Sequence, residues 1–142
     1  MKKTIVYFGL GLLLSCGSHS HQAKPKPLVE ILSQQVDGGA RIPFFEFLTE
    51  PKEIKMLQND PQLGRKINTE DLKACNFVLA NLGEKETEGY QWQLDQVSET
   101  KDSIHIIMNE IPPTKPNPAE KDIYYTPFTV LKINSKKPIR IN

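Results

Sequence analysis

The stretch FVLANL, at residues 77 to 82, decides the fold that the sequence predicts. Asn81 is the only polar residue in it. An apolar run of this length is typical of a strand that is covered on both faces of a sheet. We therefore expect residues 77 to 82 to form a central strand, with other strands on both sides of it.

Further strands are predicted along the chain. The clearest pattern lies at residues 90 to 95, where Tyr90, Trp92 and Leu94 alternate with polar residues, so one face of this strand should be core and the other wet. The apolar run at 104 to 111 is expected to pair with it as a hairpin across the polar turn 98 to 103. The other expected strands cover residues 28 to 32, 44 to 48, 128 to 133 and, as a short edge, 139 to 141.

One early helix is predicted between two prolines. Thr49 can cap its N-terminus, and Pro51 is tolerated in its first turn. Ile54 and Leu57 form an apolar stripe, and Pro61 ends the helix.

The segments between these elements have turn and loop compositions. Asp37 and two glycines after it form a turn, residues 61 to 71 a loop, and residues 83 to 89 a polar turn. Four prolines between 112 and 120 exclude a central strand there and predict an extended loop. The sequence thus predicts an α+β domain, mainly antiparallel β, with one or two short helices. The β part is either a small sandwich or a partly open sheet.

Charge and motifs exclude several functions. Eighteen Lys and Arg against 17 Asp and Glu give a formal net charge of +1, so no basic surface for nucleic acid is indicated. The chain contains no nucleophile elbow, no zinc-protease motif and no phosphate-binding loop. We expect no cofactor, no resident metal and no small-molecule substrate.

The first 15 residues have the pattern of an export signal. Lys2 and Lys3 provide a basic start, and an apolar stretch follows from Thr4 to Leu14. At a helical rise of 1.5 Å per residue this stretch covers about 16 Å, which is roughly half of a hydrocarbon core. It is too short to span a membrane alone, so residues 1 to 15 are predicted to be a signal peptide.

Residues 13 to 16, Leu-Leu-Ser-Cys, resemble the lipobox of bacterial lipoproteins. The resemblance implies that the signal is cut before Cys16, that the Cys16 thiol receives a diacylglyceryl group, and that the new amine is acylated, for example with palmitate. The alternative is a chance Cys after an ordinary signal. Two or three acyl chains anchor a protein stably on a membrane. Gly17, in place of a retaining Asp, favours the periplasmic face of the outer membrane, with surface exposure as the alternative.

A tether is predicted between the lipid and the fold. Residues 17 to 27 are almost free of apolar side chains and end in Lys-Pro-Lys-Pro. The chain thus divides into a signal at 1 to 15, a lipidated Cys with its tether at 16 to 27, and a single β-rich domain at 28 to 142. His19 and His21 lack a third ligand and form an incomplete metal site.

Cys75 and His105 are a candidate pair for thiol catalysis, because a nucleophilic thiolate needs an adjacent base. Cys75 also suits a small buried residue next to the strand at 77 to 82, and His105 lies within a β-like run. We favour this second interpretation, in which neither residue is catalytic.

The segment from residue 77 to 134 resembles the C-terminal domain of the PrcB family, named for a subunit of a bacterial surface protease complex. The matching features are the strand 77 to 82, the turn 82 to 85, the run Thr87-Glu88-Gly89-Tyr90, the strand 104 to 111 with its proline-rich exit, and Thr126-Pro127-Phe128 before the last strand. The family has Gly where this chain has Glu88. The resemblance implies a non-catalytic, lipid-anchored accessory protein that binds an envelope protein such as a protease.

The run Thr87, Glu88, Gly89, Tyr90 is the candidate contact site, because a glycine-bearing turn that presents an aromatic residue often forms an interaction edge. The alternative is that this turn only sets the register of the next strand. The run also resembles the Thr-Thr-Gly-Tyr loop of chagasin-type inhibitors of papain-like proteases. Protease inhibition is therefore the alternative function.

Overall fold

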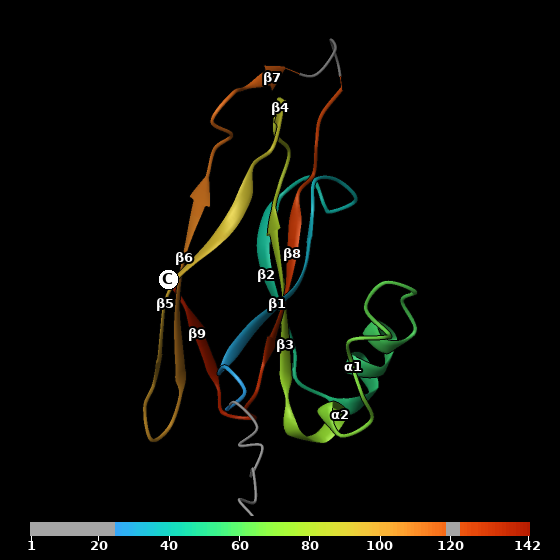
Figure 1. Ribbon diagram of the computed structural model, residues 1–142, viewed down its shortest axis with the longest axis vertical. Helices are drawn as coiled ribbons and strands as arrows, with labels where there is room; N and C mark the ends of the chain where they lie inside the picture. Colours follow the sequence, from blue (N-terminus) through green and yellow to red (C-terminus); the bar gives the residue numbers. More distant parts are fainter. Residues whose placement is uncertain (1–24, 119–122) are drawn as a thin grey trace, which may run out of the picture.

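The computed structural model describes residues 25 to 118 and 123 to 142. A four-stranded main sheet forms its centre, and a three-stranded second sheet lies beside it (Figure 1). The order of the main sheet is β1 (Val29–Gln35), β8 (Phe128–Ile133), β3 (Asn76–Leu82) and β2 (Pro43–Leu48), with every pair antiparallel.

The second sheet has the order β5 (Gln91–Glu99), β6 (Ile104–Ile111) and β9 (Ile139–Ile141). A separate two-stranded ribbon pairs β4 (Thr87–Glu88) with β7 (Asn117–Pro118). The helices are α1 (Pro51–Gln58) and α2 (Asp71–Ala74). The predicted α+β class, mainly antiparallel with one or two short helices, is confirmed. No helix in the described part of the chain is long and apolar enough to cross a membrane.

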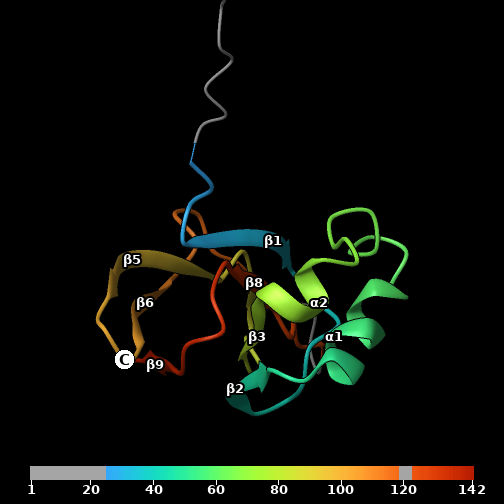
Figure 2. The same cartoon turned by 90° about the horizontal axis from the view of Figure 1, so that it is seen from below.

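The main sheet is the middle of three layers, with the second sheet on one face and the helices on the other (Figure 2). Along β3, Val78 and Ala80 pack toward the second sheet, whereas Phe77 packs toward the helices. All three side chains are fully buried. The prediction that residues 77 to 82 form a central strand is confirmed, and burial on both faces explains why the run is almost uniformly apolar.

Asn81, the one polar residue of that run, ties a loop to the main sheet. Its Nδ2 donates to the carbonyl oxygens of Ala40 (2.8 Å) and Ile42 (2.6 Å), and its Oδ1 accepts from the Ala40 N–H (3.0 Å). A Cβ at Gly39 would lie 2.1 Å from Asn81 Oδ1, so the close approach of this loop requires glycine. The buried amide is thus fully used in structure.

The start of α1 differs from the prediction. The N-cap is Glu50, not Thr49. The Glu53 carboxylate accepts hydrogen bonds from the N–H groups of both Thr49 and Glu50, at 3.1 Å each, so a side chain inside the first turn satisfies the free donors. Ile54 is fully buried in the layer between α1 and the main sheet, as the apolar stripe indicated.

Several short elements were not predicted individually. Helix α2 begins at the end of the expected loop 61 to 71, and the expected turn 83 to 89 and loop 112 to 120 contain β4 and β7. Residues 25 to 118 and 123 to 142 therefore contain nine strands, where about six were expected. Strand β9 does form an edge, but it pairs with β6 in parallel, an exception to the antiparallel pattern. Residues 119 and 120 of the expected loop lie outside the described residues.

A buried ion pair joins α2 to the main sheet. Lys132 Nζ, from β8, lies 2.8 Å from Asp71 Oδ1, and both residues are no more than 5% exposed. Burial by itself would raise the pKa of Asp71, but hydrogen bonds from Lys132 and the Asn68 N–H, together with the Lys132 charge, outweigh it and lower the pKa below its ordinary value. The short helix is thus fixed to the sheet by an ion pair that is largely shielded from water.

We expect Lys132→Met to lower the free energy of unfolding by about 3–5 kcal/mol, because it leaves the Asp71 carboxylate buried without its partner. Adding Asp71→Asn removes this charge, so the double variant should be more stable than Lys132→Met alone. Urea unfolding of the two single variants, the double variant and the wild type measures this coupling. Lys101→Met, at an exposed turn, is the control. A double variant no more stable than Lys132→Met would contradict the expectation.

Candidate functional site

Two of the four predicted contact residues, Thr87 and Glu88, form one strand of a two-stranded ribbon at one end of the long axis (Figure 1). Thr87 pairs with Pro118 and Glu88 with Asn117, so β4 is bound along one edge by β7. Glu88 lies within a strand, whose extended backbone accepts any side chain, so Glu at this position needs no special conformation. Thr87 and Glu88 are therefore one half of a ribbon, and Gly89 and Tyr90 follow directly after it.

Gly89 sets the turn that follows β4. Its φ of +100° lies in the region that favours glycine, and a Cβ there would come within 2.9 Å of Pro113 Cβ. The chain that leaves β6 thus packs directly against this turn. Both the backbone conformation and the close approach require glycine at this position.

Tyr90 is held by a lysine from residues 83 to 89, the segment predicted to be a polar turn. Lys85 Nζ lies 5.0 Å from the centre of the Tyr90 ring and 2.6 Å from Glu110 Oε1. The Lys85 backbone also exchanges two hydrogen bonds with Tyr125, at 2.8 and 2.9 Å. Lys85 therefore orients Tyr90 and connects the segment before the ribbon to the segment that leads into β8.

Strand β5 begins at Gln91, so Tyr90 lies before it and is not the first residue of its core face. Trp92 and Leu94 do pack against the core between the sheets, as their alternation predicted. A register shift between Leu94 and Gln96 then moves the inward positions, and Val97 becomes the next residue in the core. The period-two pattern is thus confirmed for Trp92 and Leu94 but not for Tyr90.

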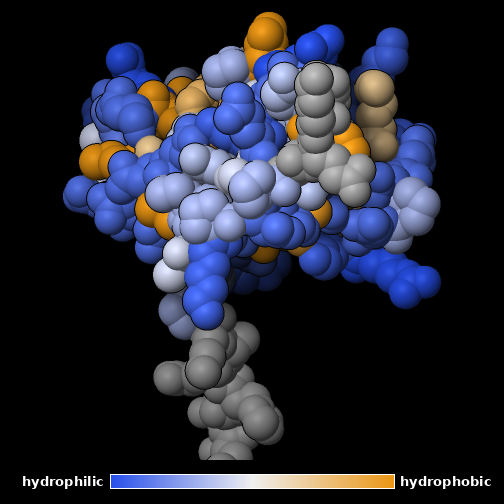
Figure 3. All heavy atoms as spheres, turned by 90° about the horizontal axis from the view of Figure 1, so that it is seen from above, coloured by the Kyte–Doolittle hydropathy of each residue, from blue (hydrophilic) through white to orange (hydrophobic). Residues whose placement is uncertain are grey.

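The end of the molecule that carries the ribbon is mainly hydrophilic. Viewed from above, its visible surface shows separate hydrophobic spots among polar residues (Figure 3). Arg41 and Glu84 form an ion pair next to the base of the ribbon. This end of the molecule is therefore suited to polar contacts around Tyr90, more than to a broad apolar interface.

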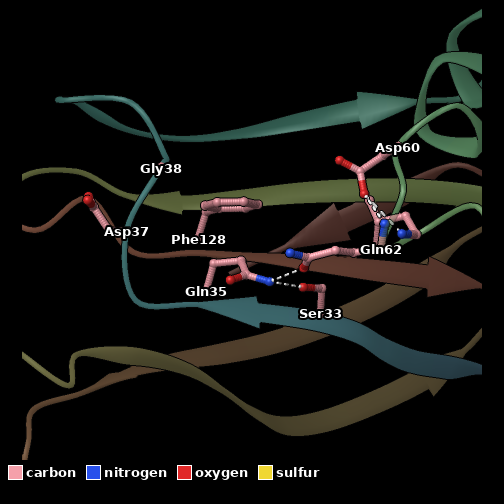
Figure 4. A pocket seen from close by; sticks show the side chains of 8 residues that line it. Ser33, Gln35, Asp37, Gly38, Asp60, Gln62 and Phe128 are labelled. Atoms are coloured by element: carbon pink, nitrogen blue, oxygen red, sulfur yellow. Dashed lines mark hydrogen bonds between the residues drawn. The ribbon is translucent and has the colours of Figure 1, made fainter.

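A polar pocket of about 240 Å³, not identified from the sequence, lies between β1 and the loop after α1 (Figure 4). Gln35 Nε2 donates to Ser33 Oγ (2.9 Å) and to Gln62 Oε1 (2.8 Å). The pocket has an acid at each end: Asp60 accepts backbone hydrogen bonds, and Asp37 accepts from the Thr126 hydroxyl and N–H, which lower its pKa. The two carboxylates do not form an acid and base pair.

The candidate thiol pair is not brought together. The Cys75 thiol lies 3.5 Å from Asp71 Oδ1 and from Asn134 Oδ1, whereas the His105 ring contacts Ser103 Oγ at 2.9 Å in the second sheet. Burial, followed by the Asp71 charge, raises the pKa of Cys75. Cys75 is 3% exposed, which confirms the predicted buried position.

No group of three or more metal-ligating side chains occurs within residues 25 to 118 and 123 to 142. The signal peptide, Cys16, His19 and His21 lie outside the described residues, and so does most of the tether. Their roles stay predictions.

We expect the Cys75 thiol to react slowly with iodoacetamide in the native protein. At pH 8.5 an ordinary thiol is about half ionised, whereas the raised pKa and the burial of Cys75 reduce both the thiolate fraction and access to it. The rate should rise strongly in urea. Cys75→Ser measures the background, and equal rates in the native and unfolded states would contradict the buried, protonated thiol.

Gly89→Ala should lower the free energy of unfolding by about 1–3 kcal/mol, because the added Cβ meets Pro113 and the positive φ is unfavourable for alanine. Glu88→Ala, next to it and exposed, should change the stability by less than about 0.5 kcal/mol. Urea unfolding compares the two variants. Similar small effects for both would show that Gly89 is not structurally required.

Comparisons of the chain with protein-family models, with curated proteins and with solved structures give no match. The resemblance of residues 77 to 134 to the PrcB family therefore rests on the matching residues themselves, and a protease-associated role stays a prediction.

Proposed function

We propose that this protein is a non-catalytic accessory lipoprotein of the cell envelope. A lipid on Cys16 holds it to a membrane, most simply the periplasmic face of the outer membrane. Thr87 and Glu88 of the ribbon, together with Gly89 and Tyr90 that follow it, bind another envelope protein, such as a protease. One observation carries this proposal: the first described residues, 25 to 28, and the β4–β7 ribbon lie at opposite ends of the long axis (Figure 1).

The point at which the tether leaves the domain determines which end of the molecule faces the membrane in this proposal. Asn134 Nδ2 donates to the Pro27 carbonyl oxygen (2.7 Å) and to Glu30 Oε1 (2.5 Å), so the chain leaves the domain at a fixed point. Cys16 and Leu28 are twelve positions apart, and a fully extended chain of that length reaches about 40 Å. A domain held in this way can stand clear of the headgroups with its ribbon directed away from the membrane.

The ribbon is also ordered before any partner binds. Pairing with β7, the contact of Gly89 with Pro113, and the position of Lys85 over the Tyr90 ring each restrict its conformation. A contact site that is already ordered loses less conformational entropy on binding. The half-buried Tyr90 ring supplies the aromatic residue that interfaces favour.

The same geometry favours accessory binding over protease inhibition. An inhibitory loop that enters an active-site cleft must project as a narrow wedge. Here Thr87 and Glu88 are paired along one edge with β7, so the ribbon is two strands wide. We therefore retain inhibition only as the alternative, to be tested by activity assays on papain-like proteases.

The proposal is tested with a photo-cross-linking amino acid placed at Glu88 in the full-length protein in its native cells. Glu88 is exposed on the ribbon, so we expect a discrete cross-linked partner that is identified by mass spectrometry. The matched control is Lys101, which is also exposed but lies in the β5–β6 turn near the opposite end (Figure 1).

Two outcomes would contradict this proposal. Absence of a specific product at Glu88, or the same product from Lys101, would exclude the ribbon as the contact site. Cys16→Ser should move the protein out of the membrane fraction and remove the acyl mass from its N-terminal peptide. Membrane retention by the Ser variant would exclude the lipid anchor.

A further inference from the structure

We propose that the free edge of β2 is a second binding site, at which an extended segment of a partner protein adds as a further strand. This site lies in the main sheet and depends neither on the lipid nor on the β4–β7 ribbon. Strand β2 is the last strand of the main sheet, and within the described residues nothing pairs with its outer edge.

Hydrogen bonds made by β3 fix which backbone groups of β2 point outward. The Leu82 N–H donates to the Pro127 carbonyl (3.0 Å) and the Asn76 N–H to the Ser135 carbonyl (3.1 Å), so the even-numbered residues of β3 face β8. The odd-numbered residues therefore face β2, since the two directions alternate along a strand. Their partners in β2 are Phe44, Glu46 and Leu48.

Phe45 and Phe47 consequently direct their backbone N–H and C=O groups away from the sheet. Neither backbone has a hydrogen-bond partner in the described part of the chain. The two residues present two donors and two acceptors in one row, which is the pattern that an added strand completes. The chemistry that recognises this row is an extended polypeptide backbone.

A groove of about 450 Å³ adjoins this edge, on the side where β2 and β9 end the two sheets (Figure 2). Phe47 and Ile139 provide apolar walls, and Asn76 also lines it. Asn76 is 2% exposed; its Nδ2 donates to the Lys137 carbonyl (3.1 Å), but its Oδ1 accepts no hydrogen bond from the described residues. A buried acceptor without a donor is rare in folded proteins, and this one belongs to the polar part of the groove lining.

The edge lacks most of the features that block strand addition. Edge strands usually carry lysine, an inward charge or a bulge, whereas β2 has the sequence PFFEFL and a regular register with β3. Phe44 and Phe47 are 36% and 41% exposed. Glu46 is its only charge, so a basic residue opposite Glu46 with apolar neighbours is the expected character of the partner segment.

A second copy of the chain fits this edge poorly. In a two-fold antiparallel pairing of β2 with β2, the register that uses all four free backbone groups places Phe45 opposite Phe47. This register also places the two Glu46 side chains directly opposite each other, and like charges at that position are destabilising. The neighbouring registers pair a free residue with Pro43, which has no N–H, or with Thr49, whose carbonyl already accepts from Lys136 Nζ (2.7 Å).

Hydrogen exchange of the full-length protein in detergent micelles tests the edge directly. The Phe45 and Phe47 amides should exchange quickly, whereas those of Phe44, Glu46 and Leu48 should be protected. Peptides selected from a displayed random library against the same protein should then protect Phe45 and Phe47 without changing exchange at Thr87 to Tyr90. Protection of all five β2 amides in the free protein would overturn the proposal.

Two variants of Phe47 distinguish the contribution of its backbone N–H to binding from the contribution of its side chain. Phe47→Pro removes one outward N–H but no hydrogen bond to β3, and Phe47→Thr removes the same ring while keeping the N–H. Against the selected peptides, Phe47→Pro should bind roughly two- to tenfold more weakly than Phe47→Thr, as expected for the loss of one hydrogen bond. Equal affinities of the two variants for the peptides would count against strand addition by a partner. So would selected peptides without an enriched basic residue, or a dimer that sedimentation shows to depend on β2.

Discussion

Both faces of the β3–β8 pair are apolar, and neither face can be left in water. Phe77 and Val130 cover one side and Val78 and Leu131 the other, all fully buried. A buried side chain of this size contributes about 1.5–3 kcal/mol, so the two that face the helices supply about 3–6 kcal/mol. This is comparable with the total stability of a small domain, about 5–15 kcal/mol, so the fold needs both covering layers.

The helical layer is the weaker of the two covers. Helices α1 and α2 have eight and four residues, lengths at which an isolated helix does not persist in water. The buried side chain of Ile54 holds α1 against the main sheet, and the ion pair of Asp71 with Lys132 holds α2 there. Burial raises the pKa of Cys75, and the charge of Asp71 raises it further while the charge of Lys132 opposes this, so Cys75 belongs to the structural contact between α2 and the sheet.

The parts of the fold that were predictable are those encoded in local apolar patterns. Residues 77 to 82, 104 to 111 and 128 to 133 form strands as predicted, because continuous or alternating apolar residues reflect how their faces are buried. Strands β4 and β7 have two residues each, too few to show any period. The contact of Lys85 with Glu110 and the hydrogen bond of Asn76 to Lys137 join residues distant in sequence, so no local pattern could reveal them.

The pairing of β1 with β8 also shapes how the chain must fold. Val29 pairs with Ile133, so the main sheet joins segments about 100 residues apart. Contacts at such separation form slowly, because the entropy of closing a long loop is lost before any contact compensates for it. Until β8 takes its place, the apolar faces of β3 stay uncovered. We therefore expect a newly made chain to be prone to aggregation until β8 has paired with both neighbouring strands.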